Sequence, residues 1–134
     1  MGAWGTGAFD NDDALDLLGS WDRVTDVAAA VREALGAVAG ATGYLESGTV
    51  NEAVAAAAVV AARAGGPPPE HPSAAEWVGA HPFAVDPGLL DLARRALDRA
   101  FEPADNEWWE LWDDAGALDD VRAALAPVRA ALGS

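Results

Sequence analysis

The segment from Thr49 to Gly65, TVNEAVAAAAVVAARAG, constrains the fold more than any other part of this chain. Alanine, the residue that favours a helix most, fills its interior. From Ala53 to Ala62 no face of such a helix carries a polar side chain. A helix that is apolar all round must be surrounded by protein, and this stretch is too short to cross a bilayer. The segment therefore predicts a buried helix at the centre of a helical domain.

Both ends of this central helix carry local signals. Thr49 and Glu52 have the spacing of a capping box, in which each side chain accepts a hydrogen bond from the other residue's backbone N–H. Gly65 can adopt the left-handed conformation that ends helices, and a run of prolines follows it. We therefore expect a helix that begins at Thr49 and covers residues 50–64.

Apolar residues spaced three or four apart indicate further helices along the rest of the chain. Residues that can cap a helix N-terminus precede most of these stretches. Gly19 should close the first helix, and Pro127 should kink the last one or start a new one. The expected caps are one of residues 10–12, then Ser20, Ser73 (in a second capping box with Glu76), Asp86 and Asp105, and the last helix should begin near Asp119.

No strand pattern and no internal repeat are found in this sequence. The length of 134 residues fits one domain, and a hydrophobic content of 51% is enough to build a core. The prediction is a single all-α domain over residues 1–134, an irregular multi-helix bundle around the central Ala-rich helix.

Charge limits the classes of partner. The net charge is −14 and all eight cationic side chains are arginines, so the chain should repel nucleic acid and anionic membranes. A basic protein partner is the expectation, and the alternative is that the acidity only maintains solubility. The absence of cysteine excludes disulfides, thiolate catalysis and cysteine-based zinc sites. With no secretory signal and an Ala- and Arg-rich, Lys-free composition, we expect a bacterial, cytoplasmic protein.

The N-terminus carries the most specific motif, MGAWGTGAFDNDDALDLL. It resembles the opening of a bacterial family, the domain of unknown function numbered 4259. The resemblance implies a small stand-alone α-helical protein, and it implies no catalytic activity. The residues that match are Gly2, Ala3, Trp4, Gly5, Gly7, Phe9, Asn11, Asp12 and Ala14.

Two groups of residues could support metal binding or acid–base chemistry. The run from Asp10 to Asp13 could ligate Mg²⁺ or Ca²⁺, but a calcium loop would continue with another oxygen ligand and a glycine, so helix capping is the preferred interpretation. His71 and His81 lie in predicted loops without metal-ligand spacing and are interpreted as loop residues. We therefore assign no metal, cofactor or catalytic residue.

The tryptophan cluster near the C-terminus is the main candidate for a binding surface. Trp108 and Trp112 should share a helix face, with Trp109 pointing elsewhere. With Glu110, Asp113 and Asp114 beside them, these aromatic side chains could anchor a partner. The alternative, which we favour, is a core plug against which Trp4 and Phe9 pack, with at least one tryptophan partly exposed.

These features lead to a functional hypothesis. We expect a non-enzymatic interaction module that offers an acidic, Trp-containing surface to a basic protein, comparable by analogy alone with an immunity protein or antitoxin. The alternative is a small enzyme or ligand-binding protein that uses the carboxylates of residues 10–13 with a histidine in a pocket. The two differ in whether those carboxylates converge with His71 or His81. The oligomeric state is not specified by the sequence.

Overall fold

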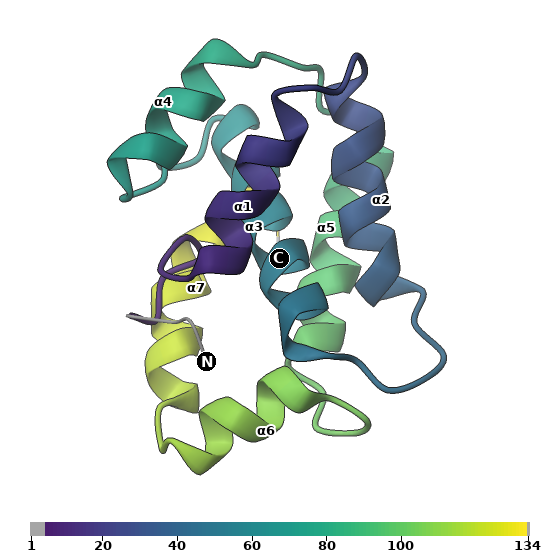
Figure 1. Cartoon of the computed structure of the whole chain (residues 1–134), viewed down its shortest axis with the longest axis vertical. Helices are drawn as coiled ribbons and strands as arrows, with labels where there is room; N and C mark the ends of the chain where they lie inside the picture. Colours follow the sequence, from purple (N-terminus) through teal and green to yellow (C-terminus); the bar gives the residue numbers. More distant parts are fainter. Residues whose placement is uncertain (1–4, 134) are drawn as a thin grey trace.

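The computed structural model describes residues 5–133, and within them it contains seven α-helices and no β-sheet (Figure 1). The all-α prediction is therefore confirmed. The helices are α1 (Asp12–Trp21), α2 (Val27–Ala39), α3 (Ser47–Arg63), α4 (Pro72–Ala80), α5 (Pro87–Ala100), α6 (Glu107–Asp114) and α7 (Leu118–Leu132).

Helix α3 is the centre of the bundle. It packs against every other helix that the structure describes (Figure 1). Residues 53–61 are all buried. Its alanines leave room for the neighbouring helices to approach closely, and their burial provides much of the hydrophobic contact. In the described part of the chain, no helix is both long enough and apolar enough to span a membrane.

The N-terminus of α3 differs from the prediction. The helix begins at Ser47, so the predicted capping box of Thr49 and Glu52 lies inside the first turns and is wrong. The backbone N–H of Ser47 instead donates to Oε1 of Glu107 at 2.8 Å. A carboxylate from α6 thus satisfies a free N–H group and complements the positive end of the helix dipole.

The C-terminus of α3 ends as expected. Gly65 has a φ of 95°, in the left-handed region, and the N–H of Gly66 donates to the carbonyl of Ala61 at 2.9 Å. Together with the bond from Gly65 N–H to the Ala62 carbonyl, this is a Schellman motif. A Cβ at Gly66 would lie 2.5 Å from Cβ of Ala131, so α7 approaches the chain closely at this turn.

The boundary between α1 and α2 was predicted wrongly. Helix α1 continues through Gly19 and Ser20 to Trp21, because burial of the Trp21 side chain favours one more helical turn. Ser20 donates from its hydroxyl to the Leu17 carbonyl and does not cap α2. Asp26 caps α2, accepting from the N–H of Ala29 at 3.0 Å.

Helix α4 begins at Pro72 with His71 at the cap position, so the predicted capping box of Ser73 and Glu76 is not formed. The reason is that proline fits the first helical position, where no backbone N–H is needed. Asp86 caps α5 as expected, accepting from Leu89 N–H at 2.8 Å. This bond, together with the ion pair to Arg32, lowers the pKa of Asp86.

Asn106, and not Asp105, caps α6. Its Oδ1 accepts from the N–H of Trp109, while its Nδ2 donates to the carbonyl of Ala100 at 2.8 Å. This fully buried side chain therefore joins the end of α5 to the start of α6. Asp105 adopts a left-handed conformation, with a φ of 49°, in the connection. Further along, α7 runs through Pro127 without a new start.

Candidate functional site

Trp108 belongs to the core. Only 3% of its surface is exposed, its indole N–H donates to Oδ1 of Asn51 at 3.0 Å, and its ring contacts Phe101 edge-on. The Asn51 side chain in turn donates to Asp13 at 3.0 Å. The neighbouring Glu52 has a raised pKa, because its carboxyl group is partly buried and lies near the negative charge of Asp13. Trp108 therefore fixes α6 onto α3 and is not available to a partner.

Trp109 and Trp112 lie at the boundary between core and surface. Both are partly exposed, and Trp112 packs against the buried cluster. The indole Nε1 of Trp109 is shielded from solvent and finds no hydrogen-bond partner among the described residues. These two tryptophans, unlike Trp108, can contribute to a surface.

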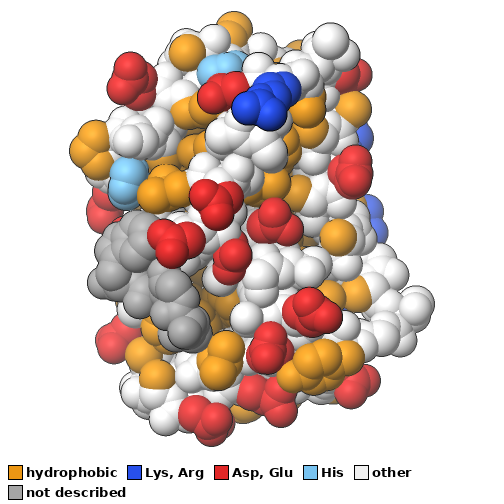
Figure 2. All heavy atoms as spheres, viewed as in Figure 1, with side chains coloured by type: hydrophobic (Ala, Val, Ile, Leu, Met, Phe, Trp, Pro, Cys, Tyr) orange, Lys and Arg blue, Asp and Glu red, His pale blue; other side chains and the backbone are white. Residues whose placement is uncertain are grey.

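Three carboxylates of α6 form the acidic part of this surface. Glu110, Asp113 and Asp114 are exposed, and none of them pairs with an arginine in the described part of the chain. Several arginines pair elsewhere, as Arg32 does with Asp86 and Arg129 with Asp98. In Figure 2, acidic side chains are spread over the visible face and several lie at the end of the molecule formed by α6, whereas the visible arginines lie at the opposite end and along one side.

Tyr44 extends this surface, although no pattern in the sequence points to it. The side chain is 57% exposed, and its hydroxyl donates to Oε2 of Glu110 at 2.9 Å. This hydrogen bond, with further contributions from partial burial and the neighbouring carboxylates, raises the pKa of Tyr44 to about 12. We call Tyr44, Trp109, Trp112, Glu110, Asp113 and Asp114 the α6 surface.

Two residues of the N-terminal segment, Asp10 and Asn11, hold a tight turn and cap α1. Asp10 accepts a hydrogen bond from Gly7 N–H at 3.0 Å, and a Cβ on Gly5 or Gly7 would lie within 2.8 Å of that carboxylate. A methyl group at either position would therefore push the Asp10 carboxylate out of its present place. Asn11 caps α1 by accepting from Ala14 N–H.

Phe9, Asp12 and Trp4 are three further residues of the motif. Phe9 is buried, but it lies two residues before the cap and not directly before it, where a hydrophobic staple would place it. Asp12 is exposed in the first turn of α1. Trp4 lies outside the described residues.

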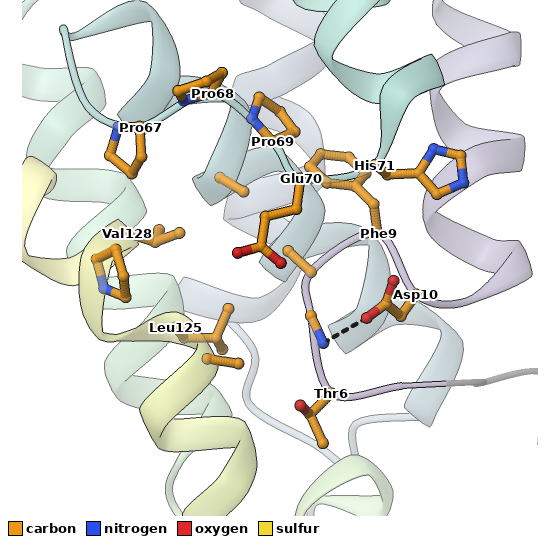
Figure 3. Close-up of a pocket in the computed structure, with 15 residues that line it drawn as sticks. Thr6, Phe9, Asp10, Pro67, Pro68, Pro69, Glu70, His71, Leu125 and Val128 are labelled. Carbon is orange, nitrogen blue, oxygen red and sulfur yellow. Dashed lines mark hydrogen bonds between the residues drawn. The ribbon is translucent and has the colours of Figure 1, made fainter.

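The same N-terminal turn forms one wall of a surface groove with a cavity volume of about 230 Å³ (Figure 3). The opposite wall is α7, with Leu125 and Val128, and the loop of residues 67–71 closes one end. Asp10 and His71 both line this groove, whereas Asp12 and Asp13 do not. The enzymatic alternative required the carboxylates of residues 10–13 to share a pocket with a histidine. Of the three carboxylates, only that of Asp10 does so.

The groove does not assemble an acid–base pair. Figure 3 shows the Glu70 carboxylate pointing into the groove and the His71 ring turned away from it. The Nδ1 of His71 is shielded and has no hydrogen-bond partner among residues 5–133. The Asp10 carboxylate is held by Gly7. A general base needs an oriented partner, and none is in place here.

His81 lies at a separate place, between α1 and α4. Its ring stacks on Trp77 with 4.2 Å between ring centroids, and its Nε2 lies 3.2 Å from Oδ1 of Asp22. The indole N–H of Trp77 donates to the same carboxylate oxygen at 3.0 Å. These contacts attach α4 to the end of α1. Nowhere in the described residues do three or more potential ligand side chains gather as a metal site would require.

Comparison with models of known protein families gives a match over most of the chain. A family model described as Domain of unknown function (DUF4259) matches residues 2–124, from the N-terminal motif into α7. No curated protein and no solved structure shows a significant match.

Proposed function

The chain belongs to the DUF4259 family, whose description names no activity, and we propose its function from the α6 surface. The protein is a non-enzymatic module that binds a basic protein. The observation that carries this proposal is that the carboxylates of Glu110, Asp113 and Asp114 pair with no arginine in the described part of the chain. Like charges on one short helix repel each other, and a basic partner relieves that repulsion.

The aromatic side chains on this surface support the proposal. Tyr44 is exposed beside Glu110, and Trp109 and Trp112 are partly exposed on α6. Aromatic residues are enriched among the side chains that contribute most to protein–protein binding. The carboxylates would speed the approach of a basic partner, and the aromatic rings would supply contact area once it has docked.

The charge also bears on the class of partner. A net charge of −14 disfavours nucleic acid, whose phosphates would be repelled at every approach. A bacterial, cytoplasmic protein that neutralises a basic toxin, as antitoxins and immunity proteins do, would suit this surface, and that comparison is an analogy. The enzymatic alternative has less support, because Asp10 and His71 line one groove without bonding to each other.

The test is capture of the partner from the native cell at low salt, followed by binding kinetics. Changing Glu110, Asp113 and Asp114 together to lysine should slow association at least tenfold, and the wild-type rate should fall steeply with salt. The matched control is Asp16→Lys, Glu33→Lys and Glu76→Lys, which makes the same charge change at exposed positions on α1, α2 and α4. If both triple variants slowed association equally, the slowing would come from net charge alone, and a specific α6 surface would be refuted.

A further inference from the structure

The groove beside the N-terminal turn has a chemistry that the α6 surface does not explain. Part of its wall is apolar, formed by Phe9, Leu125, Val128 and several prolines (Figure 3). Among the described residues, two carboxylates, Asp10 and Glu70, line it, and no arginine does. A volume of about 230 Å³ is below the usual range for drug-sized ligands, so the groove fits a small molecule or one side chain.

We propose that this groove binds a small organic cation of the primary alkylammonium class. The ammonium group lies against the Glu70 carboxylate, which points into the groove and forms no hydrogen bond or ion pair with any described residue. The aliphatic body of the ligand packs on Leu125 and Val128 of α7. Asp10 contributes negative charge at the other wall while it remains bonded to Gly7.

Other ligand classes fit less well. An anion would meet two carboxylates and no cationic side chain, which is unfavourable at short range. A divalent metal ion prefers several oxygen ligands at close distance, and no group of three candidate side chains is found within residues 5–133. A neutral apolar ligand would displace water from Glu70 without replacing its hydrogen bonds.

The experiment titrates the full chain with 1,4-diaminobutane at constant ionic strength and follows backbone amide chemical shifts by NMR. Saturable shifts are expected for Gly7, Glu70, His71 and Val128. Neither 1-butanol nor butyrate, which have a similar aliphatic body without the positive charge, should produce them. A capped Gly-Lys-Gly peptide tests whether the primary ammonium group comes instead from a lysine side chain of another protein. Tighter binding of the peptide than of the diamine would assign a lysine side chain and overturn the small-molecule proposal.

The variant test uses Glu70→Gln, in an exposed loop where the fold does not depend on the charge. Affinity for 1,4-diaminobutane should fall roughly ten- to a hundredfold, as for the loss of one charge-assisted hydrogen bond. The matched control Glu76→Gln, on the exposed face of α4, should bind as the wild type does. Shifts that spread evenly over the acidic surface, or an equal loss in both variants, would show non-specific counterion binding and overturn the proposal.

Discussion

The indole N–H of Trp108 donates a hydrogen bond to the side-chain oxygen of Asn51, at 3.0 Å inside the core. Because Asn51 also donates to Asp13, one asparagine joins α1, α3 and α6. Helix α6 is thus held by a specific polar contact as well as by packing. The position of the α6 surface on the molecule depends on this contact.

We predict that Asn51→Leu lowers the free energy of unfolding by about 1–3 kcal/mol, because the buried indole N–H of Trp108 loses its partner. Urea denaturation measures this. The double variant with Trp108→Phe removes the donor as well, so its cost should be smaller than the sum of the two single costs. Additive costs would mean that the hydrogen bond does not couple the two residues.

Ala57→Glu should unfold the domain or cause aggregation. Ala57 is fully buried in α3, and an unpaired buried charge costs several kcal/mol, a large part of the total stability of a small domain. The control is Ala37→Glu, an exposed position on α2, which should remain folded. Circular dichroism and size-exclusion chromatography distinguish the outcomes. A soluble Ala57→Glu protein with an unchanged melting temperature would contradict the architecture.

Two glycine-to-alanine changes should have opposite effects. Gly66→Ala should destabilise by roughly 1–3 kcal/mol, because the new Cβ would overlap Ala131 and the Ala61 carbonyl. Gly36→Ala should stabilise by about 0.4–1 kcal/mol, since nothing lies within 4 Å of the new methyl group and alanine favours the helix. Thermal melting of both variants measures the difference. If the melting temperatures of both variants shifted in the same direction, the close packing described around Gly66 would be contradicted.

Tyr44, the only tyrosine in the chain, should ionise near pH 12 and not near its ordinary value of 10. Since folding raises this pKa, the associated stabilisation is complete below about pH 10 and is lost as the pH rises through about 12. Ultraviolet absorbance of tyrosinate follows the titration. Glu110→Gln should lower the midpoint, whereas Asp113→Asn should change it little. A midpoint of 10 in the wild-type protein would show that the bond to Glu110 is absent in solution.

Added monovalent salt should raise the melting temperature. The screening length falls from about 10 Å at about 0.1 M to about 3 Å at about 1 M, which reduces repulsion among the excess carboxylates. The triple lysine variant at positions 110, 113 and 114 should show a smaller rise, because its net charge is closer to zero. A melting temperature that does not respond to salt would mean that repulsion is already relieved within the fold.

Local sequence patterns were sufficient to predict the fold class, the central helix and several helix ends. Apolar residues at every position from Ala53 to Ala62 predict a surrounded helix, and residues 53–61 are indeed buried. Gly65 acts through its own backbone geometry, and Asp86–Pro87 acts through a side-chain cap three residues away and the fixed φ of proline. These roles could therefore be predicted without knowing any distant neighbour.

Only the tertiary structure decided the contacts that join distant residues. Glu107 caps Ser47 across 60 positions of sequence, and burial of Trp21 extends α1 past Gly19 and Ser20. The candidate sites depend on such contacts as well, because Tyr44 meets Glu110 through folding. Capping and propensity act within a few residues and contribute about one kcal/mol each, so burial and long-range hydrogen bonds override them when the chain packs.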